Sequence, residues 1–352
     1  MAGLSGTDGV RARINTGPMT AEAVVRLALA AGRWFADHND RSSPARPIVV
    51  IGKDTRLSGY MLESALVAFS TSSGLLFRLL VPTPPSALAH STRSLRAEFG
   101  VMLSPSHHPH HDNGIKLFGP DGFKLDDKIE SEISALAAGS ILLADAPDLG
   151  RARRMLDSVG RYVEFAKSTL PGRTRFDGLK LVVDCANGAA YRTAPDTLYE
   201  LGAEIVPLAV SPDGLNINEN CGAVHPQVMA AAVVAHGADA GICLDGDADR
   251  LIMADETGKI IDGDQILGCL ALAMQERGTL ANNAVVGTVM TNRGLEARLG
   301  KAGIDLHRVA VGDRYILEKM RQDGLNLGGE PSGHMLMTDF ARSGDGLLTA
   351  LQ

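Results

Sequence analysis

The first clear signal of the fold is the stretch Ile48-Val49-Val50-Ile51-Gly52-Lys53-Asp54-Thr55-Arg56. Its first four residues are β-branched and apolar without alternation, which predicts a buried strand covered on both faces. A polar loop follows, and then Leu62, Leu66 and Phe69 recur at helical spacing. A strand, a loop and a helix in this order predict a mostly parallel sheet flanked by helices.

The same succession of elements recurs along the chain. Residues 75–81 and 101–103 predict two further buried strands, and the pattern begins again at 181–183 and after 263–264. We therefore expect three consecutive related α/β domains with mixed, mostly parallel sheets, covering residues 1–154, 155–254 and 255–352. Further strands are expected at 204–208, 240–244 and 284–289, and helices at 194–201, 228–236 and 265–274.

Length, charge and cysteine usage narrow the class of protein. The 352 residues predict two or three domains, and a net charge of -7 argues against a nucleic-acid partner, which needs a basic face. No apolar run approaches the roughly 20 residues of a membrane helix, and residues 1–8 show no signal-peptide pattern. Four scattered cysteines without a Cys-x-x-Cys motif indicate free thiols in a reducing compartment. We expect a cytoplasmic protein that acts on a small molecule.

Ligands of parallel α/β sheets bind at loops that leave the carboxyl ends of strands. The first such loop, residues 104–116, contains serines and ends at Lys116. A serine hydroxyl after a buried strand is suited to act as a nucleophile or phosphoryl carrier, with Lys116 as a cation or proton-transfer group. Four histidines within residues 107–111 also suggest a zinc site, but no second segment completes the ligand set. A solvated loop is the remaining alternative.

The second loop is Asp245-Gly246-Asp247-Ala248-Asp249-Arg250, directly after an apolar strand. In an extended loop, carboxylates at alternate positions point the same way, and they repel each other unless a cation lies between them. Carboxylate oxygens suit Mg²⁺, so the loop predicts a magnesium site, with an exposed acidic turn as the alternative. An EF-hand is excluded because Arg250 stands where that loop needs glycine. Arg250 beside a cation indicates a phosphate or sugar contact, or else a structural ion pair.

The third loop is Gly328-Gly329-Glu330-Pro331-Ser332-Gly333-His334. It combines an acid, a hydroxyl and an imidazole in a glycine-rich turn, which suits recognition of vicinal sugar hydroxyls. A surface turn fits the same residues. The chain contains no Walker A loop, and no dinucleotide-binding glycine motif in the required setting.

In this order, the three loops resemble those of the α-D-phosphohexomutase family, and Gly-Thr-Asp-Gly-Val-Arg at 6–11 is similar to the family's opening motif. The bacterial phosphoglucosamine mutases are the most similar branch, on the stretches at 186–191, 212–218, 221–226 and 311–315. The resemblance implies three α/β domains and a fourth, α+β domain with an Arg-x-Ser-Gly-Thr-Glu loop for the substrate phosphate. That motif does not occur in the 352 residues, so we expect a chain that lacks the fourth domain and has impaired turnover.

The resemblance also implies a mechanism. Ser106 is expected to be a phosphoserine, with Mg²⁺ held by Ser106, Asp245, Asp247 and Asp249. The phosphoryl group would pass to glucosamine 6-phosphate, giving a bound glucosamine 1,6-bisphosphate. That intermediate would return its other phosphoryl group and leave glucosamine 1-phosphate, which feeds UDP-N-acetylglucosamine and peptidoglycan precursor synthesis. Lys116 and Arg11 are the other expected catalytic residues, and the expected substrate-binding residues are Arg250, Asp313, Glu330, Ser332 and His334.

A few positions depart from the family pattern. His108 stands where the family usually has Asn, and His110 and His111 replace an aromatic pair. Ala12 stands where glycine is common, and Pro331 fills the variable position of the third loop. Phosphomannomutase or phosphoglucomutase activity, or a non-catalytic relic that binds sugar phosphate, are the alternative functions. No nucleic-acid or membrane partner is expected, and the protein is expected to be a monomer or a homodimer.

Overall fold

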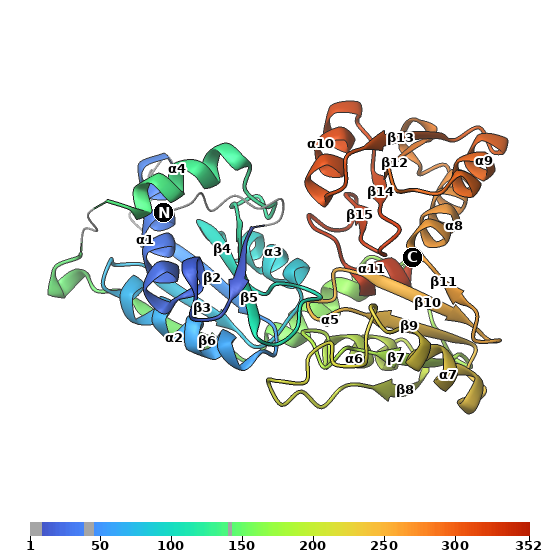
Figure 1. The fold of residues 1–352 in the computed structure, drawn as a ribbon, viewed down its shortest axis with the longest axis horizontal. Helices are drawn as coiled ribbons and strands as arrows, with labels where there is room; N and C mark the ends of the chain where they lie inside the picture. The colour runs from blue at the N-terminus through green and yellow to red at the C-terminus, as the bar shows by residue number, and fades with distance from the viewer. Residues whose placement is uncertain (1–8, 39–45, 140–142) are drawn as a thin grey trace.

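The computed structural model describes residues 9–38, 46–139 and 143–352. These residues form three α/β units, each built on its own sheet, and the second and third units lie together beside the first (Figure 1). The expected fold class, three consecutive α/β units with mixed and mostly parallel sheets, is confirmed. Residues 6–8 of the opening motif at 6–11 lie outside the described residues.

The first unit is a six-stranded sheet in the order β1-β5-β4-β2-β3-β6. Strands β4, β2, β3 and β6 are parallel, whereas β5 pairs antiparallel with β4 and β1 pairs antiparallel with β5. The strands are β1 (Val10–Arg13), β2 (Ile48–Lys53), β3 (Leu76–Leu80), β4 (Phe99–Leu103), β5 (Asp112–Phe118) and β6 (Arg151–Met155). The helices are α1 (Ala21–His38), α2 (Leu57–Thr71), α3 (Pro85–Ser94) and α4 (Asp127–Ala137), with short 3₁₀ turns η1 (Gly17–Met19) and η2 (Ala146–Asp148).

The two faces of this sheet carry separate hydrophobic clusters. Val49 of β2 packs in the cluster formed with α1 and α2, and Val50 packs in the cluster formed with α3. The strand is therefore covered on both faces, which is why its sequence shows no alternation between apolar and polar residues.

The second unit has the sheet order β11-β10-β9-β7-β8, and the third has the order β13-β12-β14-β15. The strands are β7 (Lys180–Asp184), β8 (Glu204–Leu208), β9 (Ala240–Leu244), β10 (Leu251–Asp255), β11 (Ile260–Ile261), β12 (Ala284–Thr288), β13 (Asp305–Val309), β14 (Leu327–Gly329) and β15 (Met335–Met337). The helices are α5 (Ser158–Ser168), α6 (Thr193–Glu200), α7 (Gln227–His236), α8 (Gly263–Glu276), α9 (Arg293–Lys301), α10 (Asp313–Asp323) and α11 (Gly346–Leu351), with the 3₁₀ turn η3 (Ala281–Asn283).

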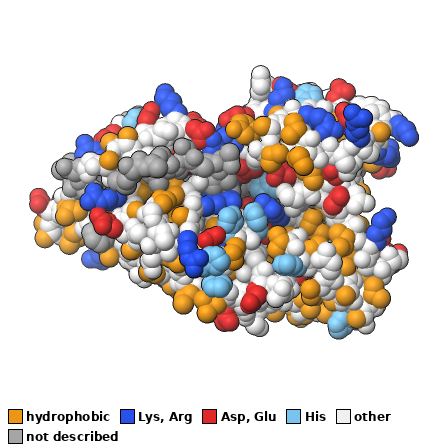
Figure 2. Space-filling model, viewed as in Figure 1, with side chains coloured by type: hydrophobic (Ala, Val, Ile, Leu, Met, Phe, Trp, Pro, Cys, Tyr) orange, Lys and Arg blue, Asp and Glu red, His pale blue; other side chains and the backbone are white. Residues whose placement is uncertain are grey.

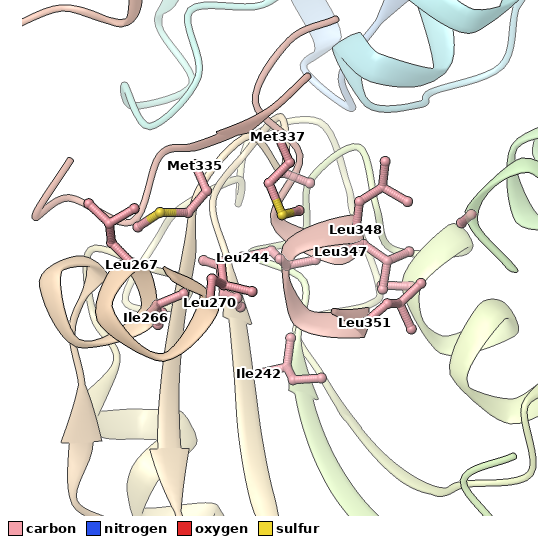
Figure 3. Close-up of a cluster of buried hydrophobic side chains, with 14 of the residues drawn as sticks. Ile242, Leu244, Ile266, Leu267, Leu270, Met335, Met337, Leu347, Leu348 and Leu351 are labelled. Atoms are coloured by element: carbon pink, nitrogen blue, oxygen red, sulfur yellow. The ribbon is translucent and has the colours of Figure 1, made fainter. Parts of the chain in front are cut away.

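One hydrophobic core joins the second and third units. Figure 3 shows Leu244 of β9 near Leu267 and Leu270 of α8 and Met335 of β15, with the side chains of α11 beside them. Leu347, whose side chain lies in this core, is fully buried. The loops that leave β9 and β14 are thus fixed relative to each other by a shared apolar interior.

Most of the predicted apolar strands are found in the structure. The strands predicted at 204–208 and 240–244 coincide with β8 and β9, and the one at 101–103 is the end of β4. The sequence did not indicate β5, which carries Asp112, Asn113 and Lys116, or β6, whose first four residues are exposed. The division into domains at 154 and 254 stays a prediction.

No helix in the described residues is long and apolar enough to cross a membrane. All four cysteines are free thiols, and three of them are buried: Cys185, Cys221 and Cys243.

Candidate active site

Three loops from three sheets meet at one place. The loop with Ser106 follows β4, the loop 245–250 follows β9, and the loop with Glu330 follows β14, so each leaves the carboxyl end of its strand. Figure 2 shows histidine and charged side chains gathered in the hollow where the first unit meets the other two.

Ser106 is buried and tightly positioned. Its relative exposure is 1% and its backbone is in the left-handed region, with φ at 60°, a conformation that is uncommon for a residue other than glycine. Its carbonyl oxygen accepts hydrogen bonds from Arg56 Nη2 and Asn218 Nδ2, both at 3.1 Å. Its hydroxyl donates to Asp245 Oδ2 at 2.5 Å and lies 3.4 Å from Asp249 Oδ1. The surrounding side chains therefore hold the Ser106 hydroxyl against the acidic loop.

The acidic loop forms a tight turn, so the expectation of an extended loop is wrong. Ala248 has a φ of 61°, and its amide donates to the Asp245 carbonyl at 2.9 Å. The turn still brings Asp245, Asp247 and Asp249 together: all three are buried, and one oxygen from each lies within 4.8 Å of the others. Among the described residues, this is the one group that brings three such ligand atoms together, and the histidines at 107–111 do not form another.

Gly246 allows the acidic loop to approach the Ser106 loop closely. A Cβ atom at position 246 would lie 2.6 Å from the Ser106 carbonyl oxygen and 2.6 Å from Asn218 Nδ2. Such distances are shorter than any van der Waals contact, so the backbones can meet here only because residue 246 has no side chain.

The three buried carboxylates repel one another and have lost their hydration. Burial and the charges of the neighbouring Asp249 and Asp247 together raise the pKa of Asp245 to about 8. Burial alone would also raise the pKa of Asp249, but Lys116 and His334 outweigh it and hold that pKa well below its usual range. A divalent cation would relieve both the repulsion and the desolvation, and carboxylate oxygens are the ligands that Mg²⁺ prefers. The residues present therefore fit such a cation.

Lys116 and Arg11 lie on adjacent strands at the edge of this group. Lys116 Nζ donates to Asp247 Oδ2 at 3.0 Å and lies 3.5 Å from Asp249 Oδ2. Arg11 of β1 lies beside β5, with Gly114 as its register partner. Burial, together with the charges of Arg250, His108 and Arg11, lowers the pKa of His107 to about 4, so His107 is neutral at physiological pH.

Arg250 and His334 connect the acidic loop to the third unit. The two residues pair as an isolated β-bridge, and His334 Nδ1 lies 3.6 Å from Asp249 Oδ1. Although burial lowers the pKa of His334, the charges of Asp249 and Asp313 raise it to about 9. Arg250 Nε is buried without a hydrogen-bond partner in the described part of the chain. A buried donor of this kind is costly unless a ligand accepts from it.

The remaining predicted residues are held in other contacts. Glu330 Oε1 accepts from the Gly312 amide at 3.0 Å, and Glu330 Oε2 accepts from the Ser332 hydroxyl at 3.1 Å. Asp313 Oδ2 lies 2.5 Å from Lys124 Nζ of the first unit and 3.7 Å from His334 Nε2. Asp313 therefore links the first and third units through Lys124.

His108 lies in the same loop as Ser106 but contacts different groups. His108 Nδ1 lies 3.0 Å from Asp112 Oδ2, and the His108 carbonyl accepts from Asn218 Nδ2 at 3.1 Å. Its imidazole therefore contacts Asp112 at the start of β5.

Two positioning residues were not predicted from the sequence. Arg56 is fully buried, pairs with Asp54, and donates to the carbonyl oxygens of Ser106 and His108. Its signal was present, because residues 54–56 follow β2, the strand adjacent to β4, and so leave the same edge of the sheet as the Ser106 loop. Asn218 lies in the stretch 212–218, which carried the resemblance but was given no role.

Comparison with known proteins agrees with this arrangement. Models of the phosphoglucomutase/phosphomannomutase α/β/α domains I, II and III match residues 2–141, 160–258 and 262–352. A phosphoglucosamine mutase from Paracoccus denitrificans is 58% identical over 349 residues, which are 99% of this chain and 77% of that protein. A phosphoglucosamine mutase from a Ruegeria species is 55% identical over 351 residues, which are 100% of this chain and 78% of that protein.

A solved structure shows the same arrangement of units. The crystal structure of a phosphoglucomutase/phosphomannomutase family protein from Burkholderia thailandensis has a TM-score of 0.83 and 25% sequence identity, and covers 99% of this chain and 74% of its own. Three domain models, two relatives of more than half identity and this structural match all agree. The chain belongs to the phosphoglucomutase/phosphomannomutase family of phosphohexomutases.

Proposed function

We propose that the chain carries out the reaction of a phosphoglucosamine mutase, the interconversion of glucosamine 6-phosphate and glucosamine 1-phosphate. The choice of an amino sugar is supported by relatives of this name at 55–58% identity over nearly the whole chain. The observation that carries the chemistry is the Ser106 hydroxyl, buried and 2.5 Å from Asp245 Oδ2 within a cluster of three carboxylates. The product, glucosamine 1-phosphate, would feed amino-sugar metabolism. The proposed enzyme is cytoplasmic and is a monomer or a homodimer.

Ser106 is the proposed carrier of the phosphoryl group, as a phosphoserine in the resting enzyme. Asp245, Asp247, Asp249 and an oxygen of that phosphate would hold Mg²⁺. When bound, the ion would neutralise the charge on the transferring phosphoryl group and align it with the attacking oxygen. The left-handed backbone of Ser106, held through its carbonyl by Arg56 and Asn218, fixes the direction in which the phosphoryl group points.

In the proposed first transfer, a hydroxyl of glucosamine 6-phosphate attacks the phosphorus atom. The bond from phosphorus to Ser106 Oγ breaks, and a bond to the sugar oxygen forms. Lys116 relays the proton of the attacking hydroxyl to the released Ser106 oxygen, which leaves as a hydroxyl, and Arg11 stabilises the charge that develops. Lys116 Nζ is suited to this role because Asp247 Oδ2, at 3.0 Å, positions it beside the acidic cluster. The bound glucosamine 1,6-bisphosphate then reorients in the site and returns its other phosphoryl group to Ser106.

The loops of the third unit are the proposed sugar site. Glu330 and Ser332 would exchange their hydrogen bond with each other for hydrogen bonds to sugar hydroxyls. Arg250, whose Nε is buried without a partner among the described residues, would donate to the substrate. His334 and Asp313 would fix the edge of the site, since they connect Asp249 to Lys124.

A coupled assay with glucosamine 6-phosphate, combined with mass spectrometry of the purified protein, tests this proposal. We expect formation of glucosamine 1-phosphate and one phosphoryl group on Ser106, which Ser106→Ala abolishes. Ser104→Ala is the control within the same peptide, and it should still gain the phosphoryl group. Activity confined to mannose or glucose phosphates would contradict the choice of amino sugar. Phosphorylation of Ser106 without turnover would instead support a chain that binds sugar phosphate but does not complete the cycle.

A further inference from the structure

A pocket of about 390 Å³ lies away from the candidate active site, where β3 and β6 meet the end of α3 and the start of α5. Its walls include Arg78, Arg153 and Arg161, and we call it the arginine pocket. None of its lining residues belongs to the candidate active site. Four arginines around one cavity, these three and Arg154, are unexpected in a chain with a net charge of -7.

Two of these arginines lie next to each other on one face of the sheet. Arg78 of β3 and Arg153 of β6 are register partners in a parallel pair. Two residues further along each strand, Leu80 and Met155 belong to the hydrophobic cluster that packs under α3. Side chains alternate between faces along a strand, so Arg78 and Arg153 lie on this same face.

This pairing costs stability unless an anion offsets it, because like charges side by side on neighbouring strands repel each other. Protection of a sheet edge by charged residues would account for Arg153, since β6 is the last strand of the sheet. It does not account for Arg78, which lies on the inner strand β3. A ligand with negative charge accounts for both.

The charges around the pocket are not balanced by its own acids. Asp157 is the one acid among the lining residues, and its Oδ2 already lies 2.7 Å from Arg161 Nε. Arg154 is committed elsewhere, since its Nη2 lies 2.8 Å from Glu63 Oε1. Arg78 donates to a backbone carbonyl, that of Phe77, at 3.2 Å, and it forms no ion pair with any acid among the described residues. The amino end of α5, which starts at Ser158, adds partial positive charge at the same point.

We propose that the arginine pocket binds a small molecule with two or more phosphate groups on an apolar or aromatic body, as a nucleotide has. Guanidinium groups present paired donors that match phosphate oxygens. The pocket also has an apolar wall formed by Leu95 and Leu156, and the side chain of Leu156 is 79% exposed. The volume is within the range of small-molecule sites, roughly 300–1,000 Å³.

Calorimetric titration of the protein with ATP, tripolyphosphate and adenosine at about 50 mM salt tests the proposal. We expect ATP to bind, adenosine to bind much more weakly, and the double variant Arg78→Gln/Arg153→Gln to lose at least about tenfold in ATP affinity. Arg151→Gln is the matched control, because Arg151 is an exposed arginine of the same strand that does not line the pocket. It should stay within about twofold of the unchanged protein. If the double variant folds poorly, Arg153→Gln alone takes its place, because Arg153 is exposed on the edge strand β6, and it too should weaken ATP binding.

Several results would overturn the proposal. Absence of ATP binding, or equal loss in Arg151→Gln, would show that the pocket is not a specific site. Displacement of ATP by glucosamine 6-phosphate would assign the binding to the active site. Tripolyphosphate binding as tightly as ATP would remove the role of the apolar wall, and tighter binding of a single-stranded oligonucleotide would remove the small-molecule assignment.

Discussion

Two buried acidic regions lie where the three units meet, and they differ in how their charge is satisfied. Asp345 accepts hydrogen bonds from the Ser86 hydroxyl of α3, from the Tyr162 hydroxyl of α5 at 2.6 Å, and from the Leu348 amide of α11 at 2.9 Å. We call this group the Asp345 joint. The acidic cluster of Asp245, Asp247 and Asp249 instead places three carboxylates within 4.8 Å of one another.

The difference distinguishes a carboxylate with a structural role from carboxylates of the candidate active site. At the Asp345 joint, burial raises the pKa of the carboxyl, and hydrogen bonds from neutral donors of α3, α5 and α11 offset part of that rise. In the acidic cluster, burial and the neighbouring carboxylates both act in the same direction on Asp245 and raise its pKa to about 8. A buried carboxylate that accepts hydrogen bonds from several neutral donors stabilises the fold. Buried carboxylates that lie close together and repel one another indicate a site for a cation or a charged ligand.

Removal of one carboxylate from the acidic cluster should give the largest effect. We expect Asp247→Ala to lower phosphoryl transfer by about 10³-fold, because the cation and the positioning of Lys116 both depend on that carboxylate. The fold should persist, since Lys116 keeps Asp249 as a partner at 3.5 Å. Transfer rates and Mg²⁺ affinity of the purified variant provide the measurement. Glu256→Ala, an exposed acid in the same unit, is the control. Unchanged transfer in Asp247→Ala would remove the metal assignment.

The same kind of change at the Asp345 joint should affect stability. Asp345→Ala leaves the buried hydroxyls of Ser86 and Tyr162 without an acceptor and removes the N-cap of α11. We expect a loss of about 2–4 kcal/mol in the free energy of unfolding, measured by urea titration. Ser86→Ala, which removes one donor and leaves the others, should cost about 1 kcal/mol. If Asp345→Ala were no more destabilising than Ser86→Ala, the carboxyl would not be the centre of the joint.

A change in the backbone contact between the two loops should have an intermediate effect. In Gly246→Ala the new methyl group would lie 2.6 Å from the Ser106 carbonyl oxygen and from Asn218 Nδ2. We expect the Ser106 loop to shift and turnover to fall by about 10- to 100-fold, since small displacements of reacting groups are costly. Gly160→Ala is the control: a Cβ there meets nothing within 4 Å, and the residue lies within α5. It should leave turnover unchanged and stabilise the protein by up to about 1 kcal/mol.

The sequence predicted the parallel core well, because strands covered on both faces consist of continuous apolar runs such as Ile48-Val49-Val50-Ile51. It also located the three loops, because ligands bind at the carboxyl ends of such strands. It could not predict the contact of Asp313 with Lys124, because these two residues are 189 positions apart in sequence and belong to different units. Arg56 was missed for a similar reason: its role depends on β2 lying beside β4, a neighbour relation that local pattern does not contain.

The geometry of the acidic loop shows a different limit. The alternating positions of Asp245, Asp247 and Asp249 predicted that their carboxylates lie close together. They do, but the backbone that brings them together is a turn with Ala248 in the left-handed region. The sequence carries no turn signal at Ala248, because alanine rarely adopts this conformation and is held in it by the surrounding structure. Spacing alone therefore predicted that the three carboxylates lie together, but not the turn that brings them together.

The smallest expected effect concerns His90, at the contact between the first and second units. Its imidazole stacks on the ring of Phe165 with 4.3 Å between centroids. Burial lowers its pKa below the ordinary value, and the charges of Arg93 and Arg161 lower it further. As the pH falls below about 6.5, the unfolded chain binds this proton before the folded one does, so folding should lose stability over that interval. Unfolding free energies measured between pH 5 and 7.5 should fall less steeply in His90→Gln than in the unchanged protein. Parallel curves would mean that this contact does not sense the charge of the imidazole, and that the units are held together by the Asp345 joint and the shared apolar core.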